Sequence, residues 1–249
     1  MKTIVSALAI AAASTALAVE SSNTFGILRV DSDKAQTIIS IPWENAGGGA
    51  IKVKDVVKTA NLTPKSDDPA YIGDQLYYYN GSSYKMWRLT SSGWEGATIV
   101  ANGITPTAGS DTDELARGGA LILVRKNPTA GTPAVANPFY LYGQYNSTQP
   151  LISVTRNDSS VTYTLIAPPS ANAVSLNAGT WAGVTSGDQV ILPNGQPLYW
   201  KDSTDKWCTL TTNLDTGDET YTPYTTPVPA GEGVWMRVQK GSGTVSVQW

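Results

Sequence analysis

Two aspartates stand in the same sequence frame and are the best-placed carboxylates in the chain. Asp74 lies in GDQLYYYNG (73–81) and Asp188 in GDQVILPNG (187–195). Glycoside hydrolysis requires two carboxyl groups roughly 5–9.5 Å apart, and symmetry between the two frames could bring this pair together. The competing interpretation is that each aspartate caps its own turn by accepting backbone N–H groups. We expect this structural role.

Composition restricts the other chemistry. The chain has no histidine, which removes the Ser-His-Asp and Cys-His mechanisms and the common zinc sites. Cys208 is the one cysteine, and the apolar pattern of KWCTL predicts a buried thiol, with pairing between chains as the alternative. Acidic segments at 31–33, 111–114 and 215–219 resemble calcium loops but lack EF-hand spacing. We therefore predict no catalytic residue, metal site or cofactor.

Aromatic side chains remain as ligand-binding candidates. The chain has eight tryptophans and twelve tyrosines, and exposed rings of this kind can stack on sugars because they combine an apolar body with a polar tip. Strand alternation places Tyr77 and Tyr79 on one face. The alternative is that the rings pack in the core. The candidate binding residues are Tyr77, Tyr79, Tyr84, Trp87, Trp94, Trp200 and Trp207.

The two frames also indicate the elements that position these residues. Asn80-Gly81 is a hairpin signal, since a type I′ turn requires positive φ at both central residues, and Asn194-Gly195 falls in the corresponding turn of the second frame. Each frame opens a three-stranded meander whose third strand begins near Trp94 or Trp207. Short runs rich in Val, Ile, Thr and Tyr predict an all-β protein, sandwich-like or barrel-like, with little helix. Residues 50–62 could form a short helix or an edge strand, and we expect the short helix.

Matches beyond the frames predict two related units. RGGALILVRK (117–126) matches GEGVWMRVQK (231–240) with the same offset as the frames, and TIISIP (37–42) matches TLIAPP (164–169) with a larger offset. Matched blocks in constant order indicate a duplicated unit, and the copies should share one strand order. The predicted division is a signal peptide (1–18), a first β repeat unit (19–128), a linker (129–137) and a second β repeat unit (138–249).

Strands are also predicted near both ends of the mature chain. TFGILRV (24–30) has apolar residues on both faces, so we expect it to be covered on both. GTVSVQW (243–249) alternates apolar and polar residues, which predicts a half-buried closing strand. A hairpin with 231–240 is its simplest pairing.

The first residues predict export. Lys2, an apolar run over 4–13 and Ala16-Leu17-Ala18 fit a secretory signal peptide cleaved after Ala18. No later run approaches the roughly 18 apolar residues of a membrane helix. The net charge is −3 without a basic cluster, which argues against a nucleic-acid partner. We expect a secreted protein in the extracellular space, on the cell surface or in the periplasm.

The order of these motifs resembles a known group of sequences. The opening SNTFGILRVDSDKAQTIISIPW (22–43), the meander starting at Gly73 and the closing strand over 118–124, repeated at 231–238, are similar to uncharacterised secreted two-repeat β proteins of verrucomicrobial-type bacteria. The group has a proline where this chain has Arg117. The resemblance covers most of the mature chain and implies a secreted β protein without transferring any catalytic residue.

These observations predict a non-enzymatic surface, matrix or filament protein with a structural or adhesive role. Its expected partners are further copies of itself or an extracellular glycan. The first alternative is a carbohydrate-binding module that uses exposed Trp and Tyr. The second is a glycoside hydrolase that depends on carboxylates.

Overall fold

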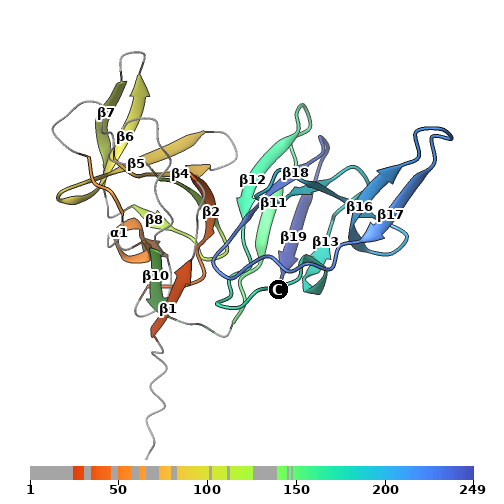
Figure 1. Cartoon of the computed structure of the whole chain (residues 1–249), viewed down its shortest axis with the longest axis horizontal. Coiled ribbons are helices and arrows are strands. Elements are labelled where there is room, and N and C mark those ends of the chain that lie inside the picture. The colour runs from red at the N-terminus through yellow and green to blue at the C-terminus, as the bar shows by residue number, and fades with distance from the viewer. Residues whose placement is uncertain are drawn as a thin grey trace, which may run out of the picture.

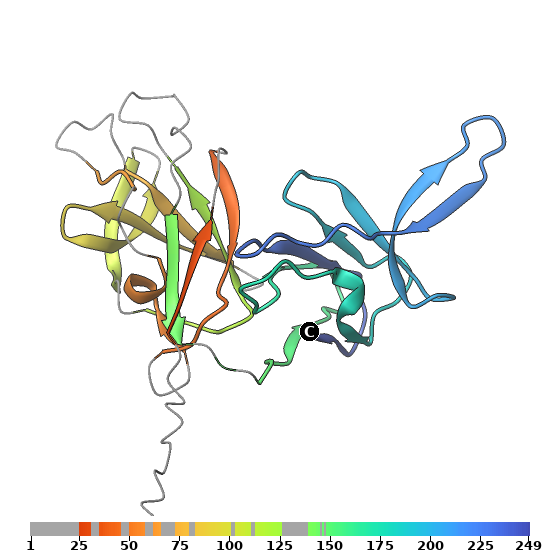
Figure 2. The same ribbon diagram turned by 60° about the horizontal axis from the view of Figure 1, so that its bottom comes forward.

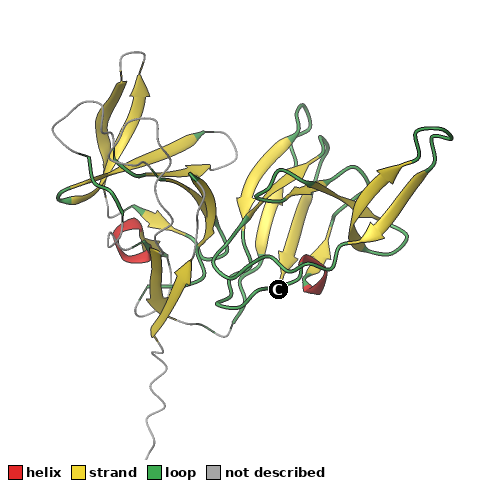
Figure 3. Cartoon of the chain, in the orientation of Figure 1, coloured by secondary structure: helices red, strands yellow, loops and turns green. Residues whose placement is uncertain are grey.

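A computed structural model gives the fold over most of the chain. It describes residues 25–30, 35–45, 50–57, 62–65, 73–79, 83–100, 103–110, 113–125, 139–144, 146 and 148–249. The predicted signal peptide, the linker 129–137 and the Asn80-Gly81 turn lie outside these residues. The described part is nearly all β, as predicted (Figure 3).

The described residues up to 144, which we call the first half, contain ten strands and one short helix. They are β1 (Phe25–Val30), β2 (Gln36–Ser40), β3 (Ile51–Lys52), α1 (Val53–Val56), β4 (Gln75–Tyr79), β5 (Tyr84–Thr90), β6 (Gly93–Val100), β7 (Gly103–Ser110), β8 (Glu114–Leu115), β9 (Ala120–Val124) and β10 (Phe139–Gln144). Helix α1 is the short helix expected within 50–62. No helix in the described ranges is long and apolar enough to cross a membrane.

The second half contains nine strands and one 3-10 turn. They are β11 (Ile152–Thr155), β12 (Thr162–Ile166), η1 (Leu176–Ala178), β13 (Thr180–Ala182), β14 (Gln189–Ile191), β15 (Pro197–Lys201), β16 (Lys206–Thr212), β17 (Glu219–Pro223), β18 (Val234–Val238) and β19 (Thr244–Gln248). Ser175 caps the 3-10 turn by accepting the Asn177 N–H.

Two six-stranded antiparallel sheets form the framework (Figure 1). Their strand orders are β2-β9-β4-β5-β6-β7 and β12-β18-β14-β15-β16-β17. Strands that correspond in sequence occupy the same position in each sheet: the Gly-Asp-Gln frames lead into β4 and β14, and the glycine-led blocks form β9 and β18. The shared order is the one expected of the two predicted units.

The strand registers fix which residues of β9 and β18 correspond. Gln75 pairs with Val124, and its counterpart Gln189 pairs with Arg237. Val124 therefore corresponds to Arg237, whereas the sequence match aligned it with Val238, so that predicted alignment is wrong by one position. The second half is shorter by one position between its frame and its closing strand.

The edge strands keep the predicted alignment. Thr37 pairs with Leu123 and Thr164 pairs with Met236. Since Leu123 and Met236 correspond in the two closing strands, Thr37 of β2 corresponds to Thr164 of β12, as the match of TIISIP with TLIAPP predicted.

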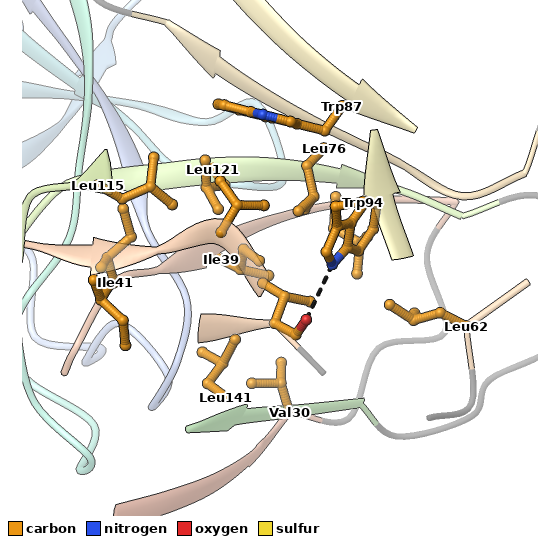
Figure 4. Close-up of a cluster of buried hydrophobic side chains, with 14 of the residues drawn as sticks. Val30, Ile39, Ile41, Leu62, Leu76, Trp87, Trp94, Leu115, Leu121 and Leu141 are labelled. Carbon is orange, nitrogen blue, oxygen red and sulfur yellow. Dashed lines mark hydrogen bonds between the residues drawn. The ribbon is translucent and has the colours of Figure 1, made fainter. Parts of the chain in front are cut away.

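A smaller sheet covers the inner face of each six-stranded sheet, so each half is sandwich-like. The β1–β10 pair contributes Leu28, Val30 and Leu141 to the first core, part of which Figure 4 shows. The β11-β19-β13 sheet contributes Val154 and Val245 to the second core. Residues 139–144, assigned from the sequence to the second unit, therefore pair and pack with the first half.

Two expectations for the terminal strands need correction. Strand β1 is covered on one face only, since Leu28 and Val30 are buried whereas Ile27 is 65% exposed. The closing strand β19 is present, with Val245 and Val247 buried, but it pairs with β11 and β13 and not with 231–240. Backbone hydrogen bonds from Gly241 N–H to Asn157 O and from Arg156 N–H to Gly243 O hold the 241–243 bend on the smaller sheet.

The halves join through backbone hydrogen bonds, and Figure 2 shows the two side by side. The Ser40 N–H donates to Gly231 O (2.8 Å), and the Ala167 N–H donates to Gly118 O (3.0 Å). Ser40 corresponds to Ala167 and Gly118 to Gly231 in the alignment of the halves, so each bond maps onto the other and the junction has an approximate two-fold relation. A small apolar cluster of Ile38, Ala120, Leu165 and Ala167 is shared by the two halves.

Arg117 ties the same junction together. Its guanidinium donates to Pro42 O (3.1 Å) of the first half, to Thr148 O (2.6 Å) before β11 and to Pro169 O (3.2 Å) after β12. Arg117 therefore has a structural role at the junction.

Candidate functional site

Both frame aspartates are fully buried and serve the backbone. Asp188 accepts the Thr185 N–H (2.9 Å) and the Gln239 N–H (2.8 Å), and Asp74 accepts the Thr63 N–H (2.8 Å). A carboxylate with no exposed surface is not accessible to a substrate. These contacts fit the turn-capping interpretation.

Each aspartate lies near a buried arginine, supplied by a different strand. In the second half, Arg156 at the end of β11 binds both oxygens of Asp188, at 2.6 and 3.0 Å. In the first half, burial lowers the pKa of the Arg125 guanidinium after β9, and the charge of Asp74 partly opposes that shift. In the alignment of the halves, Arg156 corresponds to Arg29 of β1 and not to Arg125. Both halves therefore keep the aspartate of the Gly-Asp-Gln frame, but the arginine near it comes from a different strand in each half.

The four candidate tryptophans are buried, as the core-packing alternative describes. Trp87 and Trp94 lie in the first core, and Trp200 and Trp207 in the second, where their ring centroids are 5.2 Å apart. The Trp94 N–H donates to Val57 O (3.1 Å), as Figure 4 shows. None of these four rings presents a face to a ligand.

The three candidate tyrosines, in contrast, come together at the surface. Ring centroids are 4.7 Å apart for Tyr79 and Tyr84, and 6.4 Å for Tyr77 and Tyr84. Trp235 of β18 joins from the second half, 5.8 Å from Tyr79. We call Tyr77, Tyr79, Tyr84 and Trp235 the aromatic cluster. Trp235 was not among the predicted site residues. The alternation of residues along β18 did not reveal that the outer face of this strand contacts the other half.

The environment of the cluster disfavours ionisation of two of its hydroxyls, those of Tyr77 and Tyr84. Burial raises the pKa of Tyr77 above its ordinary value, and burial together with the neighbouring Tyr79 raises the pKa of Tyr84. The Tyr77 hydroxyl donates to Gln75 Oε1 (2.6 Å). Tyr84 remains 56% exposed, so its ring is accessible from solvent.

A groove of about 470 Å³ adjoins the aromatic cluster at the junction. It has contributions from β4 in the first half and from β11, β12 and their connection in the second. We call it the junction groove. It is lined by Tyr78, Tyr79, Ser153, Val154, Thr155, Arg156, Asn157, Thr162 and Thr164.

The lining of the junction groove is polar but carries no free charge. The hydroxyls of Ser153, Thr155, Thr162 and Thr164 make no hydrogen bond within the described part of the chain. Arg156, the charged residue of the lining, is held by Asp188. The groove therefore offers aromatic rings, hydroxyls and an amide.

Metal and thiol chemistry find no support near this groove. In the described ranges, no three His, Cys, Asp or Glu side chains are grouped to hold a metal ion. Cys208 is buried in β16, and burial raises the pKa of its thiol. This placement agrees with the buried-thiol prediction.

No protein-family model, curated protein or solved structure matches the chain. Any role for the junction groove and the aromatic cluster therefore rests on their geometry and chemistry.

Proposed function

We propose that this chain is a secreted, non-enzymatic adhesive protein built from two related β units, which holds an extracellular ligand in the junction groove. The observation that carries this proposal is the lining of the groove. The first half supplies two tyrosine rings, and the second half supplies Ser and Thr hydroxyls that make no hydrogen bond within the described residues, while the arginine of the lining is neutralised by a buried aspartate.

Several features support a duplicated origin of the two units. Corresponding strands share one order, corresponding residues pair within the two sheets, and the hydrogen bonds at the junction map onto each other. The duplication gives the molecule a junction, and the groove lies at it. Export rests on the N-terminal pattern, and the resemblance to secreted two-repeat proteins agrees with it.

The groove chemistry favours binding over hydrolysis. General acid–base catalysis needs a titratable group within hydrogen-bond reach of the substrate. The described lining contains no carboxylate, and Asp188 beneath it has no exposed surface. We therefore prefer adhesion to glycoside hydrolysis.

Two of the edge strands disfavour filament growth by strand pairing. The outer strands β7 and β17 contain Pro106 and Pro223, respectively. Proline cannot donate a ladder hydrogen bond, and it protects edges from pairing with other chains. Assembly by pairing of these outer edges is therefore disfavoured.

The test is an adhesion assay with the intact mature chain on beads. The surfaces are immobilised polysaccharides, peptidoglycan and matrix proteins. We expect retention on at least one polymer, no turnover of that polymer, and at least tenfold weaker retention for Thr155→Arg, which fills the groove from an exposed position.

The matched control is Thr220→Arg, an equally exposed threonine on another edge strand. It should bind like the wild type. Absence of adhesion to every polymer, or equal adhesion by Thr155→Arg, would overturn the proposal.

A further inference from the structure

We infer that the ligand of the junction groove is a neutral oligosaccharide whose chain continues from the groove onto the aromatic cluster. This inference rests on the proposed function, because it concerns the same site, and it adds the chemical class of the ligand. Three properties of the site carry it: its hydroxyls, its neutralised charge and its continuous rings.

The hydroxyl-bearing residues of the lining lie in two rows, one on β11 and one on β12. Ser153 and Thr155 alternate with Val154 on β11, and Thr162 and Thr164 alternate with Tyr163 on β12. Alternate residues of a strand point to the same side. Each hydroxyl can donate one hydrogen bond and accept two, which matches the mixed donors and acceptors of a sugar.

The charge arrangement disfavours an acidic ligand. The Arg156 guanidinium binds both oxygens of Asp188 and also donates to Gly183 O (2.8 Å) and Gln239 O (3.2 Å). A ligand carboxylate or phosphate that paired with the two terminal guanidinium nitrogens would have to displace these partners and leave Asp188 buried without its counter-charge. Leaving a buried charge unpaired is costly. A neutral ligand avoids that cost.

The rings provide a surface that leads out of the groove. Tyr79 lines the groove and is also a member of the aromatic cluster, in contact with Tyr84 and Trp235. Aromatic rings with polar tips pack against the apolar faces of sugar rings while their hydroxyls stay hydrated. A chain of sugars can therefore occupy the groove at one end and lie on Tyr84 at the other.

The size of the groove agrees with a short oligosaccharide. Its volume of about 470 Å³ falls within the roughly 300–1,000 Å³ of small-molecule sites.

An extended peptide is the rival occupant, because β11 and β12 are both outermost strands of their sheets. A peptide added to a sheet edge is held chiefly by main-chain hydrogen bonds. Its affinity would therefore not depend on the threonine hydroxyls.

The experiment measures binding of the intact mature chain to three sets of probes by array and by calorimetric titration. The first set contains neutral glucan, mannan, xylan and galactan oligosaccharides. The second contains uronic-acid and sulfated oligosaccharides, and the third is a library of unstructured peptides. We expect binding within the first set alone, with an affinity insensitive to salt.

The discriminating variants are Thr155→Val and Thr164→Val, which keep the side-chain shape but remove the hydroxyl. Each should weaken binding about fivefold, as expected for a hydrogen bond of about 1 kcal/mol. Thr220→Val on β17 is the control and should bind like the wild type. Unchanged melting temperatures would show that the variants remain folded.

Binding confined to acidic oligosaccharides or to peptides would overturn this inference, and so would neutral-oligosaccharide binding that both valine variants retain. If adhesion in the bead assay depends on Thr155 while no neutral oligosaccharide binds, the inference fails and the proposed adhesive function stands. If the bead assay also shows no adhesion, both fail.

Discussion

At the residue scale, each frame aspartate holds a turn closed from inside the protein. Asp188 has no exposed surface and pairs with Arg156, whose side chain is 7% exposed. The same aspartate accepts two backbone N–H groups. Aspartate at this position therefore anchors the start of β14 to the neighbouring strands.

Asp188→Asn should destabilise the fold by about 3–5 kcal/mol, since removing one partner of a buried ion pair leaves the other charge uncompensated. Urea denaturation measures the loss. Asp215→Asn in the exposed 213–218 turn is the control and should change stability by about 0.5 kcal/mol or less. A loss for Asp188→Asn no larger than that of the control would contradict the anchoring role.

The tyrosines of the aromatic cluster predict a dependence of stability on alkaline pH. The pKa values of Tyr77 and Tyr84 are raised by burial above the ordinary 10.0. Folding thus disfavours the ionised forms. Their contribution to stability is fully present below pH 10 and is lost as the pH rises above it.

Urea midpoints measured between pH 8 and pH 11 should be flat at first and then fall above pH 10. The double variant Tyr77→Phe/Tyr84→Phe should show a smaller fall. An identical fall in the variant would show that other groups cause it. Absorbance at the phenolate band reports the titration itself.

At the element scale, β19 illustrates why pairing partners are harder to predict than strands. The alternation of Val245 and Val247 correctly predicted a half-buried strand, because the period of two is a local property. The hairpin with β18 was wrong, because the bend at 241–243 carries the chain to the other layer. Which sheet a strand joins depends on contacts distant in sequence.

The same distinction between local pattern and distant contact applies to the sheets. The strand type and the two meanders were predicted from hairpin signals, and the shared strand order was predicted from the matched blocks. The shift by one position between β9 and β18 and the place of β10 could be determined only from the strand pairing in the structure.

The predicted tyrosines and tryptophans differ for the same reason. Aromatic composition alone could not show that Trp207 is in the core while Tyr84 is exposed, since either face of a strand can be the buried one.

Val247→Ala tests the role of β19 as the central strand of its sheet. Val247 is 2% exposed and lies between β11 and β13, so truncation should cost about 1–3 kcal/mol of unfolding free energy. Gln248→Ala, on the exposed face of the same strand, should cost about 0.5 kcal/mol or less. Equal effects of the two substitutions would show that the strand is not packed in the monomer.

At the scale of the whole molecule, two corresponding glycines allow the halves to pack closely against each other. Gly118 (φ +84°) and Gly231 (φ +79°) adopt the left-handed conformation, and a Cβ on either would press on the first strand of the opposite half. At Gly231 the nearest atom is Val30 Cγ2, at 2.5 Å, and at Gly118 it is Ile152 Cδ1, at 2.7 Å. Both positions therefore require glycine for conformation and for close approach.

Gly231→Ala should destabilise the protein more than Gly195→Ala does. Gly195 has a similar φ of +85° but nothing within 4 Å of its Cβ position, so its substitution measures the conformational cost alone, about 1–2 kcal/mol. The additional loss at Gly231 measures the packing between the halves. If the two substitutions cost the same, the halves do not pack as described.

The two halves form one body, and the junction groove lies where they meet. Differential scanning calorimetry of the intact mature chain tests whether they unfold as one. Because backbone hydrogen bonds and a shared apolar cluster join the halves, we predict a single transition with equal calorimetric and van't Hoff enthalpies, as for one cooperative unit. Two separate transitions, one for each half, would contradict the claim.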